Sequence, residues 1–301
     1  NIRLRYFYCL LLLFRFILKN KNTIVFCFQA NVYCVVLCKI LNIKIIVRCN
    51  TSPTGWHHNF IKRYIYKKII SLADEIITNS LEFKKEMKIN LNINSKCIYN
   101  PLNKKEILKK SKEKTDFKFF DNKKYLRLIN VARLTDQKDL ITILKSAEFL
   151  KSKKINFKLL LIGSGDQEKK LKNFIEDKKL KSDVKVLKSQ DNPYKFINKS
   201  DIFILSSKYE GLPNVLIEAA LLRKIIITTN CPTGPKEIIL NGKGGVIFEI
   251  GNYIDLSNKI IQFKKNKQKF NQKIKTIYKS LDRFDLKSNL EKYYKVIEKY
   301  I

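Results

Sequence analysis

The sequence predicts an α/β protein with two doubly wound, parallel-sheet domains. From residue 23 onward, short apolar runs alternate with stretches of helical periodicity, which is typical of parallel strands joined by helices. Two of these runs, at 157–163 and 201–206, are apolar along their whole length, as expected for strands that helices cover on both faces. The alternation stops in a lysine-rich stretch at 100–124 and then restarts, which indicates a linker between two domains.

The individual elements follow from the same pattern. In the first half, the expected strands lie at 23–28, 43–48, 75–78 and 96–99. In the second half, they lie at 125–131, 157–163, 184–187, 201–206 and 224–229, with helices that begin at Asp139, at Asp166 and near Pro213, and with further helices at the C-terminus. The apolar segment 6–18 is too short to span a bilayer and contains Arg15, so we expect an amphipathic or buried helix there.

These elements divide the chain into two Rossmann-like domains, expected at 1–112 and 113–284, that face each other across a cleft. A helix at 285–301 is expected to pack back on the first domain. In doubly wound sheets, ligands bind outside the carboxyl ends of the strands. A functional site is therefore expected on the loops that follow the strands.

The composition limits the classes of function. The 301 residues include 61 Lys and Arg against 27 Asp and Glu, which gives a formal net charge of +34. Only nine of the basic residues are Arg, whereas nucleic-acid recognition favours Arg for bidentate contacts. We therefore expect no nucleic-acid partner, but we do expect peripheral contact with anionic membranes, because a positive charge of this size attracts their head groups.

A metal site and a secretion signal are not expected either. The seven cysteines form no C-x-x-C pair, and His57 and His58 supply the only imidazoles. No small-residue cleavage site follows the apolar segment 6–18. These observations predict a protein that needs no metal or other cofactor and that lies in the cytoplasm or peripherally on the inner face of the cytoplasmic membrane.

Two carboxylates eight positions apart form the strongest local signal. Glu210 follows the strand at 201–206, and Glu218 lies in the helix expected near Pro213. The loop between them contains Gly211, Leu212, Pro213 and Asn214. Pro213 suits the first turn of a helix, so the N–H groups of this loop are expected to face a phosphate or sugar oxygen. An ionised carboxylate accepts two hydrogen bonds from vicinal hydroxyls, although the same pair would also fit solvated charges at a helix end.

Two cations follow the first strand of the second domain. Arg133 and Lys138 emerge five residues apart after the strand at 125–131. A guanidinium grips phosphate in a bidentate way and an ammonium adds a compact charge, so the pair can neutralise a diphosphate without a metal. Two exposed cations are also expected by chance among 61 basic residues. The assignment of Arg133 and Lys138 to a diphosphate therefore rests on their position after the strand.

Gly163 and Gly165 follow the strand at 157–163 and precede a helix. They match half of a dinucleotide-binding fingerprint, and a tight turn is the alternative explanation. We expect these glycines to shape a nucleotide pocket.

In order and spacing, these motifs resemble those of family-4 retaining glycosyltransferases, which have the GT-B fold. The motifs are Ala132-Arg133-Leu134 with Lys138, Gly163-Ser164-Gly165, and Glu210-x7-Glu218. The resemblance implies that Arg133 and Lys138 hold the diphosphate of a nucleotide-sugar donor and that Glu218 binds its ribose. It places Glu210 beside the donor sugar, so that Glu210, Arg133 and Lys138 are the catalytic candidates, and it implies transfer with retention of the anomeric configuration.

The segment 230–237 also resembles a stretch common in members that assemble surface polysaccharides or lipid-linked oligosaccharides. It implies transfer of a hexose or N-acetylhexosamine from a UDP-sugar to a glycan or lipid-linked acceptor. The family's glycine-rich first loop is absent, so the first domain is expected to lack its N-terminal strand. Candidate acceptor contacts follow the strand at 43–48 and are Arg48, Asn50, His57 and His58.

Two other functions fit part of the pattern. A nucleotide-sugar epimerase can have the same architecture and bind the phosphates of its substrate in the same way. A non-enzymatic basic protein that binds nucleic acid or anionic membranes would account for the charge. Glu210 and Glu218 argue against the second alternative, because two carboxylates in the expected cleft would repel a phosphate backbone.

Overall fold

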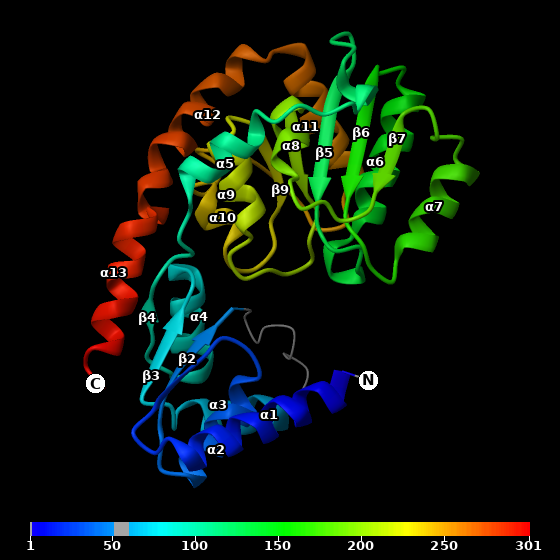
Figure 1. The fold of residues 1–301 in the computed structure, drawn as a ribbon. Helices are drawn as coiled ribbons and strands as arrows, with labels where there is room; N and C mark the ends of the chain where they lie inside the picture. The colour runs from blue at the N-terminus through cyan, green and yellow to red at the C-terminus, as the bar shows by residue number, and fades with distance from the viewer. Residues whose placement is uncertain (1, 51–59) are drawn as a thin grey trace. The chain divides into compact units, whose positions relative to one another are not determined.

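The computed structural model describes residues 2–50 and 60–301 and divides the chain into two compact units (Figure 1). Unit 1 consists of Asn1–Pro101 and Lys287–Ile301, and unit 2 consists of Leu102–Leu286. The first boundary precedes the expected one at 112, because helix α5 (Lys104–Ser111) packs on unit 2. The side-chain amide of Asn192 donates to the carbonyl oxygen of Lys110 at 2.9 Å, and Asn198 donates to that of Ser111 at 3.2 Å.

Unit 1 contains a four-stranded parallel sheet with the order β1-β2-β3-β4. The strands are β1 (Ile24–Cys27), β2 (Lys44–Cys49), β3 (Glu75–Thr78) and β4 (Lys96–Cys97). The helices are α1 (Ile2–Lys19), α2 (Asn31–Ile40), α3 (Phe60–Ile70), α4 (Leu81–Leu91) and α13 (Leu286–Ile297), the last of which belongs to unit 1 from Lys287 onward. Because each strand pairs with its predecessor along the chain, right-handed crossovers place α2, α3 and α4 on one face of the sheet.

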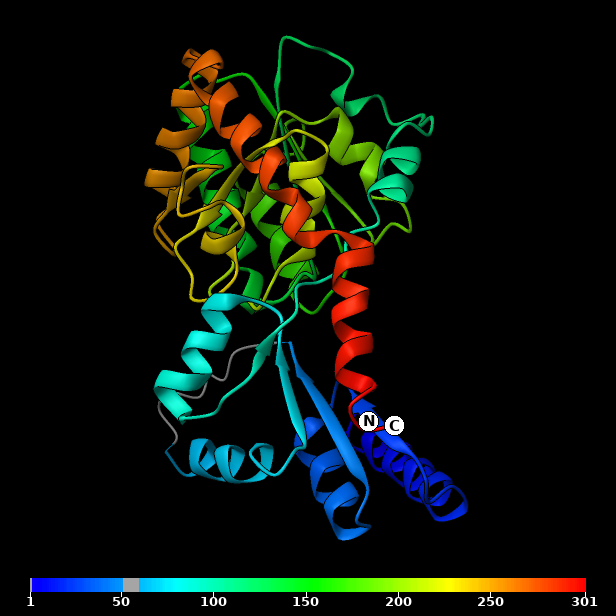
Figure 2. The same cartoon turned by 90° about the vertical axis from the view of Figure 1, so that its left-hand side faces the viewer.

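Alternating residues of β2 bury opposite faces of this sheet. Ile45 and Val47 pack in a core with residues of α1 to α4, including Val35 and Phe83. Ile46 faces the other way and packs in a cluster with Val296 of α13. The last helix of the chain, drawn in red in Figures 1 and 2, therefore covers the face that the connecting helices leave open.

Unit 2 contains a six-stranded parallel sheet with the order β10-β9-β8-β5-β6-β7. The strands are β5 (Leu126–Val131), β6 (Phe157–Ile162), β7 (Val184–Leu187), β8 (Ile202–Leu205), β9 (Ile225–Thr229) and β10 (Val246–Phe248). The remaining α-helices are α6 (Leu140–Ser152), α7 (Glu168–Asp177), α8 (Tyr194–Lys199), α9 (Asn214–Leu221), α10 (Pro235–Ile238), α11 (Tyr253–Lys265) and α12 (Gln268–Lys279). The short 3₁₀ helices are η2 (Lys118–Phe120), η3 (Asp136–Lys138) and η4 (Ser280–Phe284). The chain winds from β5 towards one edge and then from β8 towards the other, which is the doubly wound pattern.

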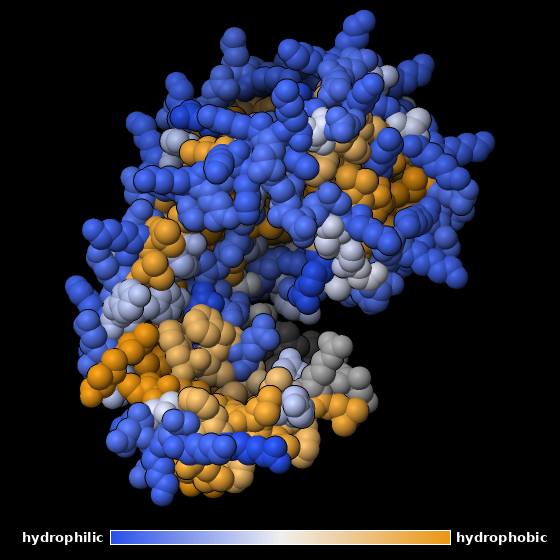
Figure 3. Space-filling view, viewed as in Figure 1, coloured by the Kyte–Doolittle hydropathy of each residue, from blue (hydrophilic) through white to orange (hydrophobic). Residues whose placement is uncertain are grey.

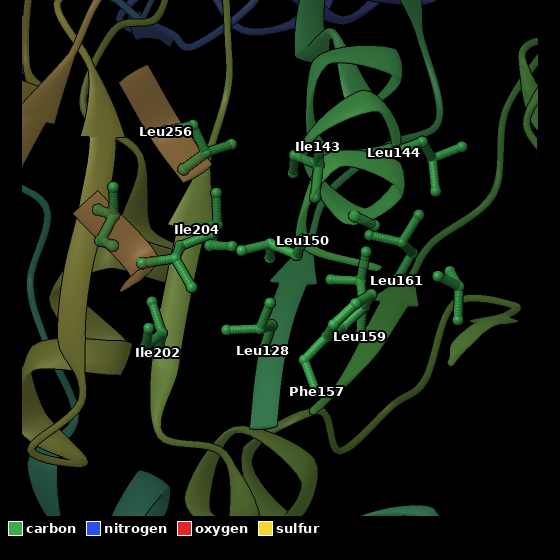
Figure 4. Packing of buried hydrophobic residues seen from close by; sticks show 14 of the residues in the cluster. Leu128, Ile143, Leu144, Leu150, Phe157, Leu159, Leu161, Ile202, Ile204 and Leu256 are labelled. Atoms are coloured by element: carbon green, nitrogen blue, oxygen red, sulfur yellow. The ribbon is translucent and has the colours of Figure 1, made fainter. Parts of the chain in front are cut away.

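The core of unit 2 lies on both faces of this sheet. Leu128 and Ile204 pack with Ile143 and other residues of α6, α7 and α11 on one face (Figure 4). Ile129 and Phe203, at the alternate positions of the same two strands, are fully buried as well. The uninterrupted apolar runs that predicted these strands thus reflect helices on both sides of the sheet.

Several elements differ from the sequence-based expectation, including the stretch at 100–124, which was expected to be a linker and contains α5 and η2. Strand β10 was not predicted, because three residues are too few to form a recognisable apolar run. Strand β4 ends at Cys97, two residues before the expected end. Helix α9 begins at Asn214, so Pro213 precedes the helix and does not lie in its first turn.

Candidate functional site

The candidate site lies at the point where the sheet of unit 2 changes its winding direction. β5 and β8 are neighbours in the sheet, although Leu128 and its partner Ile202 are far apart in the sequence. The side-chain amide of Asn130, near the end of β5, donates to the carbonyl oxygen of Ile204 at 2.8 Å and so ties the two strand ends together. The loops after these strands, 132–139 and 206–213, are therefore neighbours, which is where doubly wound sheets bind ligands.

Lys138 and Glu210 form an ion pair between these two loops. Nζ of Lys138 lies 2.5 Å from Oε1 of Glu210, and the two side chains are only 14% and 8% exposed. The hydroxyl of Ser207 donates to the same Oε1 at 2.6 Å. Oε2 of Glu210 has no hydrogen-bond partner among the described residues, so this carboxylate is held at one oxygen and the other can accept from a ligand.

The loop after β9 fixes the backbone of Glu210. The hydroxyl of Thr233 donates to the carbonyl oxygen of Glu210 at 2.6 Å. Gly234 has φ +69°, and a Cβ atom there would lie 1.7 Å from the carbonyl oxygen of Gly211. Only glycine permits so close an approach of two backbones. The segment 230–237 therefore holds Glu210 in place.

The two glycines after β6 permit a similar approach to the loop that carries Arg133. A Cβ atom at Gly163 would lie 1.8 Å from the carbonyl oxygen of Ala132, and one at Gly165 would lie 2.3 Å from that of Leu134. In the structure, the two glycines thus let this loop pack against the end of β6. A direct role in a nucleotide pocket remains a prediction.

Arg133 is exposed beside the ion pair and is joined to the second loop through Gln137. Its Nη2 donates to Oε1 of Gln137 at 3.3 Å, and the amide of Gln137 donates to the carbonyl oxygen of Tyr209 at 2.9 Å. The backbone N–H of Lys208 donates to the carbonyl oxygen of Gln137 at 2.9 Å. An exposed guanidinium next to a fixed ammonium is an arrangement that can bind a diphosphate from two sides.

Glu218 lies on α9, where its carboxyl group is largely removed from water. This burial raises the pKa of Glu218 to about 7, although the Tyr194 hydroxyl, 3.5 Å from Oε1, favours the ionised form. Burial and the Glu218 charge together raise the pKa of Tyr194 to about 12, so Tyr194 stays a neutral donor. A carboxyl group in this environment can change its charge near neutral pH.

Several of these residues have no signature in the sequence. Ser207, Gln137 and Tyr194 contact the predicted residues only because strands and helices distant in sequence come together. Cys231 is fully buried close to the Lys138–Glu210 pair, and burial raises the pKa of its thiol to about 12, so it is not a thiolate nucleophile.

The acceptor-side candidates lie in unit 1. Arg48 and Asn50 are adjacent, since a guanidinium Nη1 of Arg48 donates to Oδ1 of Asn50. His57 and His58 lie outside the described residues. In the part of the chain that the structure describes, no three His, Cys, Asp or Glu side chains are grouped to hold a metal ion, and independence of metals remains a prediction.

Comparison with known proteins identifies the class. A family model described as "Glycosyl transferases group 1" matches residues 111–280, which include every predicted donor-site residue. The chain belongs to this family. The family assignment and the fold do not favour the two alternatives, an epimerase or a non-enzymatic basic binding protein.

Two relatives match different shares of this chain. An uncharacterized glycosyltransferase of Methanocaldococcus jannaschii is 33% identical over 216 residues, or 66% of this chain and 53% of that protein. The Campylobacter jejuni N-acetylgalactosamine-N,N'-diacetylbacillosaminyl-diphospho-undecaprenol 4-alpha-N-acetylgalactosaminyltransferase is 26% identical over 83% of this chain and 68% of its own. The matched part of this chain thus spans about half the length of the first relative.

Solved structures show the same fold. Anabaena HepE in complex with UDP has a TM-score of 0.79 at 16% sequence identity, covering 95% of this chain and 82% of its own. A glycosyltransferase from Rickettsia africae has a TM-score of 0.76 at 19% identity and covers 97% and 80%. The predicted fold class, α/β with two Rossmann-like domains of the GT-B type, is confirmed.

Proposed function

We propose that this protein transfers a hexose or N-acetylhexosamine from a UDP-sugar to a glycan or lipid-linked acceptor, with retention of the anomeric configuration. The observation that carries the proposal is the buried Lys138–Glu210 pair, which lies at the winding reversal of unit 2 with Arg133 beside it. The position is where doubly wound sheets bind nucleotides, and it falls within the family match.

Each polar residue of the site has a distinct role in this proposal. Arg133 and Lys138 bind the donor diphosphate and stabilise the negative charge that grows on it as the bond to the anomeric carbon breaks. Glu218 accepts hydrogen bonds from the ribose hydroxyls. Glu210 uses its available Oε2 to orient the donor sugar, while Lys138 and Ser207 hold Oε1.

The bond changes follow from retention. The anomeric C–O bond breaks with its electron pair on the departing phosphate oxygen. The acceptor hydroxyl attacks on the same face of the sugar, and its proton passes to that phosphate oxygen. Preorganised charges around the diphosphate supply the stabilisation, so no protein nucleophile takes part in the step.

The similar proteins support the choice of substrates. The Anabaena structure holds UDP, and the Campylobacter enzyme is named as an N-acetylgalactosaminyltransferase that acts on a diphospho-undecaprenol-linked sugar. A staphylococcal relative, 32% identical over 46% of this chain and 38% of its own, is named for capsular polysaccharide biosynthesis. These names favour a UDP-sugar donor and an acceptor used in glycan assembly.

Peripheral contact with an anionic membrane is part of the proposal. The first 73 residues contain twelve Lys and Arg and no Asp or Glu. On α1 and α3, Phe7 is 68% exposed, Phe16 53% and Phe60 77%. Figure 3 shows apolar residues gathered on unit 1, whereas unit 2 in the same view is mostly hydrophilic. Basic residues among exposed aromatics suit the head-group region on the cytoplasmic side, and no described helix is long and apolar enough to cross the bilayer.

The stereochemistry of slow donor hydrolysis tests the transferase proposal. Purified protein is incubated with UDP-glucose or UDP-N-acetylglucosamine, and the anomer released first is identified by proton NMR. We expect the α-anomer first, and loss of release in Glu210→Gln but not in Glu176→Gln, which changes an exposed carboxylate on α7. Initial release of the β-anomer, or release that Glu210→Gln leaves unchanged, would contradict the proposal.

A further inference from the structure

Arg48, near the carboxyl end of β2, is a buried cation that has no anionic partner in residues 2–50 and 60–301. The residue is 8% exposed, and none of the ion pairs between described residues includes it. Burying a charge is costly unless a partner balances it. Arg127 of unit 2, whose side chain is only partly exposed, illustrates the usual solution, because its Nη2 lies 2.7 Å from a carboxylate oxygen of Asp201.

Among the described residues, the hydrogen-bond partners of Arg48 are all neutral. Its Nε donates to the Tyr293 hydroxyl at 2.6 Å, and its two terminal nitrogens donate to Oδ1 of Asn50 and of Asn100. The Phe28 ring lies 5.7 Å from the guanidinium carbon and is itself 49% exposed. A guanidinium has five N–H donors, so these contacts fix its orientation and use three of them.

The sequence on either side of Arg48 supplies no anion nearby. The sequence contains no acidic residue before Asp74. Asp74 accepts from the backbone N–H of Ile45, near the other end of β2, and pairs there with Lys39 at 2.7 Å. Within the described part of the chain, the charge of Arg48 therefore remains uncompensated at the sheet edge where parallel sheets bind ligands.

Asn79 adds an unpaired acceptor beside this cation. It is 2% exposed, and its amide donates to the backbone oxygen of Asn50 at 3.2 Å, but its buried Oδ1 has no hydrogen-bond partner among the described residues. A buried polar atom without a partner is uncommon in folded proteins and calls for a ligand or a water molecule. Arg48 thus offers N–H donors for an oxyanion, and Asn79 offers an acceptor for a hydroxyl.

We propose that the Arg48–Asn50–Asn79 cluster binds an oxyanion and an adjacent hydroxyl of the acceptor, so that the acceptor is a phosphorylated or acidic sugar. This inference rests on the proposed transferase function, because only a transferase has an acceptor. Binding of the oxyanion can nevertheless be measured without any sugar transfer. A phosphate ester and a sugar carboxylate share the chemistry that a fixed guanidinium recognises.

Arginine side-chain NMR tests this proposal with inorganic pyrophosphate and glucuronate as probes. The chain has nine arginines, so the Nε–H region is sparse, and Arg48→Lys identifies the signal of Arg48. We expect a saturable shift of that signal with at least one probe at constant ionic strength. Pyrophosphate alone would indicate a phosphate ester, and glucuronate alone an acidic sugar. An Arg48 signal that neither probe moves would overturn the inference.

Asn50→Asp provides a second variant with a side chain of the same size, which loses the hydrogen bond from Nδ2 of Asn50 to the carbonyl oxygen of Phe28. It places a carboxylate where Oδ1 of Asn50 now accepts from Arg48, so the cation gains an internal partner. We expect probe affinity at Arg48 to fall about tenfold or more, the scale of one charge-assisted hydrogen bond. Asn252→Asp is the matched control, because it adds the same charge at the cap of α11 and should leave affinity unchanged. Equal affinity in both variants contradicts the inference.

The signal of Arg133 separates the two proposals in the same experiment. A response of Arg133 to pyrophosphate reports the donor site, whereas Arg48 reports the cluster in unit 1. A shift of Arg48 without one of Arg133 would support the inference and count against the donor site. A shift of the Arg133 signal alone would support the donor site and count against the inference about Arg48.

Discussion

Nζ of Lys138 lies 2.5 Å from Oε1 of Glu210, although 72 positions separate the two residues in the sequence. Lys138 lies in the loop after β5 and Glu210 lies in the loop after β8. The contact therefore exists only because the sheet places these strands side by side. It links the cation that we assign to the donor diphosphate with the carboxylate that we assign to the donor sugar.

Breaking this pair is expected to destabilise unit 2. In Lys138→Met, the nearly buried carboxylate of Glu210 loses its ammonium, which costs about 3–5 kcal/mol when a buried pair is broken. The double variant Lys138→Met/Glu210→Gln should recover most of that loss, because no unpaired charge remains. Urea-induced unfolding of the two single variants and the double variant measures the coupling.

The matched control joins the same two loops. Lys208 and Asp136 form an ion pair at 2.7 Å whose side chains are 41% and 75% exposed. Lys208→Met should therefore cost no more than about 1 kcal/mol. A loss in Lys138→Met as small as in this control would show that the Lys138–Glu210 pair is not a buried structural contact.

The affinity for a nucleotide-sugar should depend on pH through Glu218. Its pKa is raised to about 7 by burial, so the carboxyl group of the free protein is increasingly protonated below that pH. If the ionised form accepts from the ribose, binding must first release this proton. Affinity should then fall by up to about tenfold per pH unit below 7 and level off above it.

Calorimetry with UDP-glucose between pH 5.5 and 8.5 measures this dependence, because both phosphate groups of that ligand are esterified and do not titrate in the range. Glu218→Gln should bind weakly at every pH and lose the dependence. The role assigned to Glu218 fails if the wild-type affinity is flat across the range or if the variant retains the same slope.

Gly163→Ala should displace the loop that carries Arg133. The added Cβ would lie 1.8 Å from the carbonyl oxygen of Ala132, a backbone atom that cannot move aside alone. We expect nucleotide binding to weaken and the free energy of unfolding to fall by about 2 kcal/mol or more, as in other overpacked sites.

Gly251→Ala controls for the loss of glycine itself. Gly251 has φ +75° and no atom within 4 Å of an added Cβ, so only the backbone preference of glycine is lost, about 1 kcal/mol. Nucleotide affinity should be unchanged in this variant. Similar binding in both variants would mean that the approach at Gly163 does not position Arg133.

Membrane contact should depend on the exposed aromatic residues of unit 1. Phe7→Ser/Phe16→Ser removes two exposed rings of α1, and we expect at least about tenfold weaker partitioning onto vesicles rich in phosphatidylglycerol. Ile250→Ser/Ile254→Ser, which changes exposed apolar residues of unit 2, should have no effect. Equal partitioning onto zwitterionic vesicles, or self-association through the same residues in sedimentation, would argue against this surface as a membrane contact.

Much of unit 2 was predictable because its strands are apolar along their whole length and end in polar loops. This pattern located Arg133, Lys138 and Glu210 but not their contact, since alternating strands and helices do not reveal the order of a sheet. Ser207 and Thr233 were not predicted as site residues, because a hydroxyl in a loop has no pattern of its own.

The candidate acceptor site in unit 1 was less predictable from the sequence. Arg48 was expected as an acceptor contact from its place at a strand end. Its burial depends on Tyr293, which follows it by 245 positions and comes from the last helix of the chain. Sequence periodicity does not reveal packing between residues so far apart in the chain. The uncompensated charge of Arg48 therefore became evident only in the structure.

Titration of the purified protein with UDP, followed by calorimetry, tests the central claim most directly. We predict one binding site per chain, with affinity at least about tenfold weaker in Arg133→Ala and in Glu218→Ala, the scale of one lost charge-assisted contact, and unchanged in Lys208→Met. If wild-type protein does not bind UDP, or if both site variants bind it as tightly as the wild type, the donor site does not lie at the loops after β5 and β8.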